Sequence, residues 1–289
     1  MAAQATDKEW SDPSEYLEGL EKFLAPVRNT VLWDSCWKFH TDLTHFQHLL
    51  NFLGLYTSVK GKQILDSGCG SAGLLIILNQ AGGAGLVGIE LDPNVHRLAS
   101  IRTRGLPNIR IIQDDAALLS LELESFDIIF SIHVIEHVAD YQTYLRNQAY
   151  LLKPGGLLLI ACPNRLWPFE THSKLPLIHY FPRPVSRALG NWIERTSFLP
   201  QSLRDRARTS TLYETDFTYF RLKRLLYHHG FEILEMNHPR HLVAELVSNG
   251  LEGLARTIKK LPWDCQVFAA ALFSKQLQAV CRKGSQKEP

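Results

Sequence analysis

Three polar side chains with catalytic potential lie within one five-residue stretch of the sequence. His133, Glu136 and His137 occur in FSIHVIEHVAD, residues 130–140, at spacings of three and four positions. On one face of a helix, this spacing would bring two imidazoles and a carboxylate together. Such a set could bind a transition metal or share a proton. It could also be only the polar end of a strand, so the surrounding chain must decide.

A second group of candidate residues surrounds a glycine-rich loop. GCGSAG, residues 68–73, matches G-x-G-x-x-G, follows an apolar run and opens a helical pattern, with Glu90 ending the next apolar run. This is the dinucleotide fingerprint. However, Asp66 precedes the loop by two positions, and its carboxylate would repel the doubly negative pyrophosphate of NAD. S-adenosylmethionine carries an ammonium and a sulfonium but no phosphate, so it fits Asp66 better.

Short apolar runs alternate with helical patterns along most of the chain. This alternation is typical of an α/β fold with a mostly parallel sheet. Ligands in such sheets bind at the carboxyl ends of strands, where Asp66, Glu90 and the His133 stretch are expected. Helices are predicted over 14–25, 41–57 and about 140–152. The predicted strands are QILDSG, LVGIE, NIRIIQ, FDIIFSI, LLLIACP and FEILEM, with CQVFAAALF closing the sheet.

Composition narrows the function classes. The formal net charge of +2 over 289 residues argues against a dedicated nucleic-acid protein. The five cysteines form no CxxC pair, which favours a reduced, cytoplasmic protein. The N-terminal residues show no apolar segment after a basic start, so no secretory signal is expected. No apolar run approaches the roughly 20 residues that span a bilayer.

The motifs, taken in order, resemble those of class I S-adenosylmethionine-dependent methyltransferases. ILDSGCGSAG is similar to the first motif of that family, and GIELDP, IIQDDAALLSL, SFDIIFSIHVIEHV, LLKPGGLLLIACPN and FRLKRLLYHHGFEILE follow in the family's order. The resemblance covers about residues 60–164 and 214–275. One departure is Ala72, where many members have the third glycine, and Gly73 follows one place later.

This resemblance implies a Rossmann-like, seven-stranded, mostly parallel sheet with helices on both faces, an N-terminal helical cap and lid insertions. We expect the cap in residues 1–58, the methyltransferase domain in 59–275 and a polar tail in 276–289. Insertions are expected at about 164–213 and 238–263, where the alternation of strands and helices breaks.

The resemblance also implies a set of residues for the cofactor, S-adenosylmethionine. The glycines allow close backbone approach, Glu90 accepts from the ribose hydroxyls, and Leu91 packs on the adenine. Asp115 accepts from the adenine amino group, with Asp114 as an alternative, and Cys69 contributes backbone groups only. The full expected set is Asp66, Gly68, Cys69, Gly70, Glu90, Leu91, Asp115, Ala116, Ser131 and Ile132.

FSIHVIEHV is similar to the matching segment of the ubiquinone-pathway O-methyltransferases, which carry Glu-x-x-Glu-His with a divalent metal. Here Glu136 and His137 match, but His133 replaces the first glutamate. Magnesium prefers oxygen ligands, so the replacement argues against an oxygen-rich metal site. We expect no metal and assign catalytic roles to His133, Glu136 and His137, as a base or as acceptor-orienting groups. The alternatives are a structural role for the Glu-His pair and a transition-metal site formed by His133, Glu136 and His137.

The insertion after the fifth strand mixes aromatic and basic residues and is expected to contact the acceptor. Its continuation, residues 183–208, holds six arginines with interleaved apolar residues. That segment is a candidate for peripheral membrane contact, for binding an anionic acceptor, or for a lid helix with a solvated basic face. The residues expected to bind the substrate are Arg165, Trp167, His172, His179, Tyr180 and Tyr213.

These observations predict a methyltransferase that uses S-adenosylmethionine and acts on a small-molecule or lipid-quinone-like acceptor, with oxygen as the expected acceptor atom. The alternatives are N- or C-methylation of a natural product or sugar, and a non-catalytic S-adenosylmethionine-binding scaffold. No nucleic acid is expected as a partner. Neither the acceptor's identity nor the oligomeric state follows from the sequence.

Overall fold

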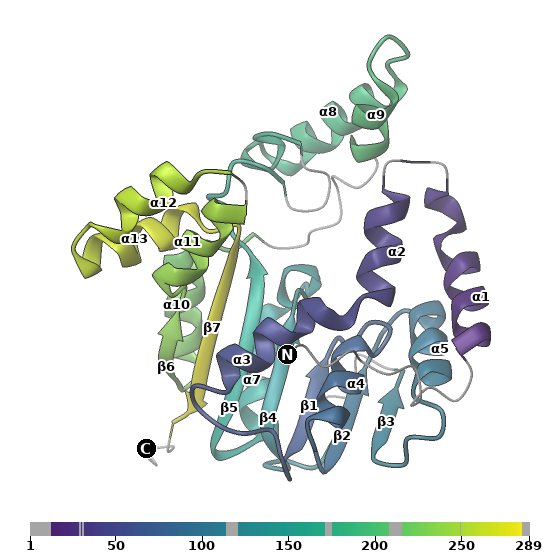
Figure 1. The fold of residues 1–289 in the computed structure, drawn as a ribbon, viewed down its shortest axis with the longest axis vertical. Helices are drawn as coiled ribbons and strands as arrows, with labels where there is room; N and C mark the ends of the chain where they lie inside the picture. Colours follow the sequence, from purple (N-terminus) through teal and green to yellow (C-terminus); the bar gives the residue numbers. More distant parts are fainter. Residues whose placement is uncertain are drawn as a thin grey trace. The chain divides into compact units, whose positions relative to one another are not determined.

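A computed structural model describes residues 13–28, 30, 32–113, 121–170, 175–207, 216–248 and 250–284. Within these ranges, seven strands form one sheet in the order β3-β2-β1-β4-β5-β7-β6 (Figure 1). β1 pairs in parallel with β2 and with β4, and β2 pairs in parallel with β3, whereas β7 runs antiparallel to both β5 and β6. The strands are β1 (Gln63–Ser67), β2 (Gly85–Ile89), β3 (Ile109–Ile112), β4 (Phe126–Ile132), β5 (Leu152–Pro163), β6 (Phe231–Met236) and β7 (Gln276–Lys283).

The chain divides into two compact units at Phe130, inside β4. In the first unit, α1 packs on α5 through buried Leu20, Leu98 and Ile101. Asp92 caps α5 by accepting from two backbone N–H groups of its first turn, as an N-cap residue should. The helices of this unit are α1 (Pro13–Leu24), η2 (Ala25–Val27), α2 (Trp33–Thr41), η3 (Leu43–Phe46), α3 (Gln47–Leu53), α4 (Gly73–Gln80) and α5 (Pro93–Arg102).

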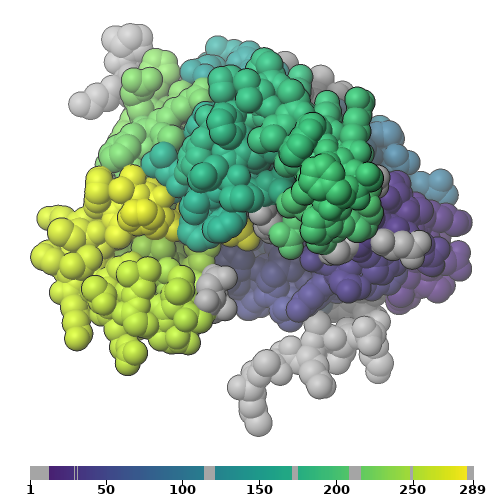
Figure 2. Space-filling model, turned by 90° about the horizontal axis from the view of Figure 1, so that it is seen from above, coloured from purple at the N-terminus to yellow at the C-terminus, as the bar shows by residue number. Residues whose placement is uncertain are grey.

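The second unit carries two groups of helices besides its strands. One group, α8 and α9, packs through Leu189, Ile193 and Leu203, and it forms the green surface in Figure 2. The other group, α11 to α13, encloses its own small core around Leu242 and Ile258. The helices are η4 (Ile135–His137), α7 (Tyr141–Leu151), η5 (Ile178–Tyr180), α8 (Arg183–Arg195), α9 (Gln201–Ala207), α10 (Tyr219–His228), α11 (Pro239–Ser248), α12 (Glu252–Lys259) and α13 (Trp263–Phe273).

The structure corrects the prediction for the last part of the chain. CQVFAAALF, residues 265–273, belongs to helix α13 and not to a strand. The seventh strand is β7, which lies within the segment 276–289 that was expected to be a polar tail. A short apolar run cannot be assigned to helix or strand from periodicity alone, and the three consecutive alanines favour a helix. Among the described residues, every helix is too short or too polar to cross a bilayer.

Candidate functional site

The glycine-rich loop joins β1 to α4 and has three residues with positive φ. These are Gly68 (φ 89°), Gly70 (φ 53°) and Ala72 (φ 64°). Gly68 and Cys69 both donate their backbone N–H to the carbonyl oxygen of Ile89, at 2.9 and 2.8 Å. The loop is therefore fixed to the carboxyl end of β2.

Glu90, directly after β2, connects the loop to the next turn. One carboxylate oxygen accepts from the N–H of Gly70 at 3.0 Å, and the other accepts from the N–H of Asp92 at 2.9 Å. A carboxylate oxygen can accept more than one hydrogen bond. Glu90 therefore keeps acceptor capacity for ligand hydroxyls while its orientation is fixed.

Asp66 is buried at the end of β1, with 3% of its surface exposed. Burial, and secondarily the negative charge of Glu90, raises the pKa of Asp66 to about 7. A cation placed beside it would favour the ionised form. Burial, followed by the charges of Asp66 and Glu90, also raises the pKa of the Cys69 thiol, so this side chain is a poor nucleophile.

The loop leaves space for a ligand beside Gly70. A Cβ added at Gly70 would meet no atom within 4 Å. Leu91, expected against an adenine, is 63% exposed. Asp115 and Ala116, with the alternative Asp114, lie outside the described residues. The described part of the loop thus fits a ligand that needs close backbone approach, a buried carboxylate and a second carboxylate nearby.

The carboxyl end of β4 carries Ser131, Ile132 and then His133. The Ser131 side chain is fully buried, with its hydroxyl 3.0 Å from that of Tyr144, so only its main chain remains for a ligand. Ile132 is half-buried. His133 has a φ of 57°, which is uncommon for a residue other than glycine, and its N–H donates to the carbonyl of Ala161 at 2.8 Å.

His133 and Glu136 form a polar pair. His133 Nδ1 lies 3.3 Å from Glu136 Oε1, and the Glu136 side chain is 1% exposed. Its other oxygen, Oε2, is buried and has no hydrogen-bond partner among the described residues. The predicted helical face is not formed, because residues 135–137 make a single 3₁₀ turn and His137 is exposed. Among the described residues, no three His, Cys, Asp or Glu side chains are arranged to hold a metal ion.

Gln276 is a neighbour of His133 that sequence reasoning missed. Its Oε1 lies 3.3 Å from His133 Nε2. A neutral imidazole that donates from Nδ1 to Glu136 has a lone pair at Nε2, so the Gln276 amide would turn its NH₂ group toward Nε2 and donate to it. A protonated imidazole would instead donate from Nε2 to the amide oxygen of Gln276. The two residues are 143 positions apart. No local pattern could have linked them.

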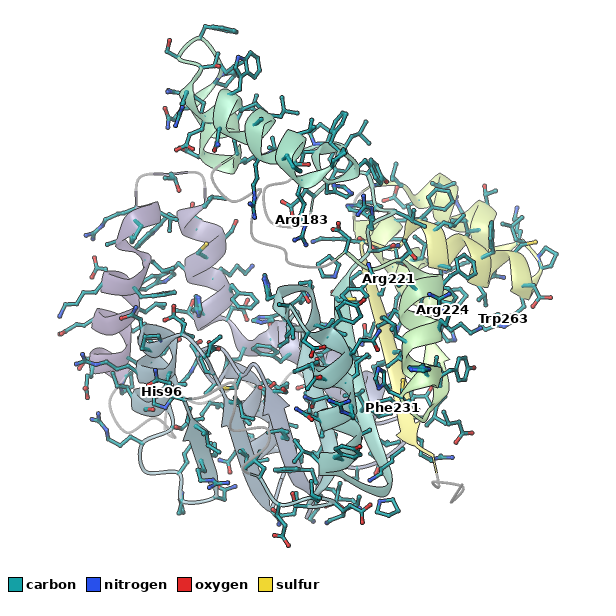
Figure 3. The ribbon with its side chains drawn as sticks, turned by 180° about the vertical axis from the view of Figure 1, so that it is seen from behind. His96, Arg183, Arg221, Arg224, Phe231 and Trp263 are labelled. Carbon is teal, nitrogen blue, oxygen red and sulfur yellow. The ribbon has the colours of Figure 1, made fainter. Side chains whose placement is uncertain are left out.

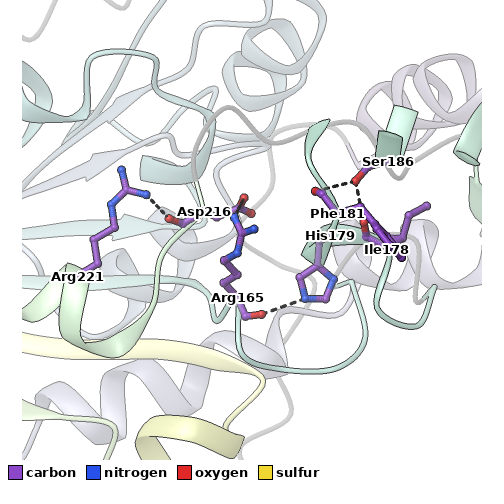
Figure 4. Close-up of polar contacts among 7 residues, drawn as sticks. All are labelled: Arg165, Ile178, His179, Phe181, Ser186, Asp216 and Arg221. Atoms are coloured by element: carbon purple, nitrogen blue, oxygen red, sulfur yellow. Dashed lines mark hydrogen bonds and ion pairs between the residues drawn. The ribbon is translucent and has the colours of Figure 1, made fainter. Parts of the chain in front are cut away.

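The expected substrate residues after β5 hold each other and the backbone in place (Figure 4). Arg165 forms an ion pair with Asp216, and the Arg165 carbonyl lies 3.0 Å from His179 Nε2. The Tyr180 hydroxyl donates to the carbonyl of Leu166 at 2.7 Å. Trp167 is half-buried. His179 Nε2 and the Tyr180 hydroxyl thus contact backbone carbonyls and shape the loop, while His172 and Tyr213 lie outside the described residues.

Arg221 stabilises the same loop from α10. This residue, labelled in Figure 3, donates to the backbone carbonyl of Asp216 at 2.6 Å (Figure 4). It also donates to the Tyr141 hydroxyl at 3.1 Å. Its guanidinium also lies 5.2 Å from the ring centres of Tyr141 and Phe217. This arginine links α7, α10 and the chain that follows the insertion, a role that its position in the sequence did not suggest.

Comparison with known families decides the kind of domain. Residues 65–160 match the family model described as a methyltransferase domain. These residues therefore form a methyltransferase domain. A solved S-adenosylmethionine-dependent methyltransferase from Mesorhizobium loti has the same fold as the chain, with a TM-score of 0.54 at 16% identity, covering 82% of this chain and 97% of that one. This likeness confirms the Rossmann-like sheet predicted from the sequence.

Two curated relatives of the methyltransferase domain act in quinone chemistry. Ubiquinone biosynthesis O-methyltransferase from Sinorhizobium fredii is 33% identical over 159 residues, which cover 54% of this chain and 59% of the relative. The 2-methyl-6-phytyl-1,4-hydroquinone methyltransferase from Synechocystis is 31% identical over 136 residues, which cover 47% and 41%. The chain thus spans about half the length of the curated relatives it matches.

Proposed function

We propose that this chain transfers the methyl group of S-adenosylmethionine to a hydroxyl of a small, quinol-like aromatic acceptor. The observation that carries the proposal is the His133–Glu136 pair at the end of β4, because a hydroxyl acceptor must lose its proton when its oxygen is methylated. The names of the two relatives, which concern ubiquinone biosynthesis and a phytyl hydroquinone, support a quinol-like acceptor.

We assign cofactor binding to the loop and its two carboxylates. Bound S-adenosylmethionine supplies an activated methyl group. The Asp66 carboxylate would pair with the ammonium group of the cofactor, and Glu90 would accept from the ribose hydroxyls. Gly68 and Gly70 would allow the backbone to come close, and the exposed Leu91 would pack on the adenine. Such contacts align the reactants, which accounts for much of the rate in a methyl transfer.

The polar pair follows the strand that adjoins β1 in the sheet. Asp66 on β1 is the register partner of Phe130 on β4, and His133 follows Phe130 by three residues along the chain. In our proposal, His133 removes the proton of the acceptor hydroxyl, and Glu136 stabilises the imidazolium that results.

We also propose that α8 and the turn after it contact a lipid surface, from which an apolar quinol would be taken. Trp192, Val185 and Phe198 expose 55%, 48% and 81% of their surfaces. Arg187 and Arg195 are exposed on the same helix. Apolar side chains beside arginines are typical of helices that lie at the interface of anionic membranes.

We place the chain in the reducing cytoplasm, with a small-molecule acceptor and no nucleic-acid partner. All five cysteines are free thiols, and Cys69, Cys162 and Cys281 are buried. The formal net charge of +2 gives no excess of positive charge for binding nucleic acid.

The test is a transfer assay with S-adenosylmethionine labelled in its methyl group. Catechols and short-chain quinols are compared with matched amines and sugars, with and without EDTA. We expect label in the catechol or quinol ether, and a large loss of transfer in His133→Gln. Transfer only to amines or to carbon would contradict the proposal, and so would a wild-type protein that does not bind the cofactor.

A further inference from the structure

A buried polar cluster in the first unit contacts the glycine loop and is not explained by the roles assigned above. Its members are Tyr16 on α1, His40 on α2, Ser71 in the loop and Arg102 at the end of α5. Tyr16 is 0%, Ser71 6% and Arg102 1% exposed, and His40 is half-buried. The members of the cluster are 24 to 86 positions apart in the sequence, so tertiary structure alone brings them together.

Arg102 joins the loop to α2. One guanidinium nitrogen donates to both the backbone carbonyl and the hydroxyl of Ser71, each at 3.2 Å. The other donates to the carbonyl of His40 at 2.9 Å. The guanidinium also lies 4.6 Å from the ring centre of Tyr16. Burying a charge is costly unless hydrogen bonds replace water, so Arg102 requires the loop and the end of α2 to be in place together.

Ser71 is the centre of the cluster. Besides Arg102, its hydroxyl lies 3.2 Å from the Tyr16 hydroxyl and 3.0 Å from His40 Nδ1. Burial, followed by the charges of Arg102 and His45, lowers the pKa of His40 to about 4. Its ring is therefore neutral, and Nδ1 can accept a hydrogen bond from the Ser71 hydroxyl. A hydroxyl offers one proton and two lone pairs, so these three partners use its full capacity.

Gly73, at the start of α4, gives an independent sign that the N-terminal helices rest on the loop. A Cβ added at Gly73 would come within 2.6 Å of the Phe46 ring and 3.0 Å of Leu43. Both residues belong to η3. A side chain at position 73 would therefore push η3 away from the loop.

We propose that Tyr16, His40 and Arg102 are positioning residues that hold the cofactor loop through Ser71 and couple cofactor binding to the ordering of α1 and α2. The inference rests on the proposed use of the glycine loop by the cofactor. It adds that the affinity for the cofactor depends on helices that need not touch the cofactor themselves.

The test measures the affinity of the full chain for S-adenosylmethionine by calorimetry. Tyr16→Phe is the primary variant, because it deletes one hydroxyl and keeps the ring. We expect its Kd to rise about fivefold, the loss associated with one buried hydrogen bond, and that of Arg102→Met to rise further. Leu242→Ala is the control: Leu242 is buried in the separate core of α11 to α13 in the second unit and is not part of the cluster. We expect a lower Tm but an unchanged Kd.

Amide hydrogen exchange separates coupling from a merely structural role. In the wild-type protein, the cofactor should slow exchange in residues 33–41, and this slowing should be lost in Tyr16→Phe but kept in Leu242→Ala. Folded Tyr16→Phe and Arg102→Met proteins with wild-type Kd would overturn this inference alone. A wild-type protein that binds no cofactor would overturn it together with the proposed function.

Discussion

Glu136 presents one carboxylate oxygen to His133 Nδ1 at 3.3 Å and keeps its second oxygen buried without a hydrogen-bond partner among the described residues. A buried carboxylate is costly unless it is paired, and the His133 ring is the partner that the described residues supply for Oε1. In the proposed reaction, a carboxylate at this distance would orient the imidazole and stabilise the charge that it gains when it takes the proton of the acceptor.

The first prediction concerns this pair. Glu136→Gln keeps the shape of the side chain and removes its charge, so we expect kcat to fall about 10²-fold or more, as is usual when general base catalysis is impaired. The kcat of His133→Gln should fall by a similar factor. Steady-state kinetics with a catechol acceptor measures both. His137→Gln, from the exposed neighbour, should retain most activity; an equal loss there would argue that the whole turn, and not the pair, is required.

The second prediction follows from Asp66. Its pKa is about 7 in the fold against 3.8 in the unfolded chain, so the folded state binds more protons between these values. The free energy of unfolding therefore decreases as pH rises from about 4 to 7, by up to about 4 kcal/mol. Urea denaturation at pH 5 and pH 8 measures this decrease, and Asp66→Asn should abolish it.

Cofactor binding should show the opposite pH dependence at Asp66. A cationic ligand prefers the ionised carboxylate, so affinity for S-adenosylmethionine should rise as pH increases through 7, with release of a proton. Asp66→Asn should bind more weakly, with little change between pH 6 and pH 8. If the affinity of the wild-type protein and that of Asp66→Asn changed equally with pH, Asp66 would not be the group that pairs with the cofactor.

The third prediction separates strain from ligand exclusion in the loop. Gly70 and Gly61 both have positive φ, 53° and 73°, and a Cβ at either would meet nothing within 4 Å. Alanine at either position should therefore cost about 1 kcal/mol of stability. Only Gly70→Ala should also weaken cofactor binding strongly, because its methyl group would take the space beside the loop. Denaturation and calorimetry on both variants make the comparison.

The fourth prediction concerns the surface of α8. Trp192→Ala should reduce co-sedimentation with vesicles that contain anionic lipid, because it removes an exposed ring beside arginines. Tyr227→Ala is the matched control, since Tyr227 is equally exposed, at 55%, but lies on α10. Binding should weaken with added salt and be absent for neutral vesicles. A loss of binding in Tyr227→Ala of the same size would mean that α8 is not the contact.

The fifth prediction is that EDTA leaves the rate of methyl transfer unchanged. Glu136 is buried and His137 exposed, so the two residues that match the metal-using family do not share one face. Full loss of activity with EDTA, restored by a divalent ion, would show that the residues rearrange around a metal.

The sequence predicted the strands well where buried runs are bounded by turn residues. QILDS, FDIIFSI and FEILEM are strands in the structure, and Asp140 caps the helix predicted over about 140–152. These signals are local: a short apolar run, a capping carboxylate and a nearby proline or glycine are enough to define them. The predicted helix over 41–57 is shorter, with α3 ending at Leu53, and α2 before it was not predicted.

The side-chain partners could not be predicted in the same way. Gln276 meets His133, and Arg102 meets Ser71, only because distant strands and helices pack together. The residue types of His179 and Tyr180 suggested contact with the substrate. In the structure, His179 Nε2 and the Tyr180 hydroxyl each contact a backbone carbonyl 14 positions earlier. Residue type indicates which interactions a side chain can make, whereas packing determines which groups lie close enough to make them.

The place of β7 in the sheet has a consequence for synthesis on the ribosome. β7, residues 276–283, lies between β5 and β6, and it is the only strand of the described sheet that pairs with β6. Chains emerge from the N-terminus at about 5–20 residues per second, so β1, β2 and β3 can pair several seconds before β7 is available. Until β7 emerges, β6 lacks the strand with which it pairs, and His133 lacks Gln276. A nascent chain stalled before residue 276 should therefore be a stronger chaperone substrate than one stalled after residue 284.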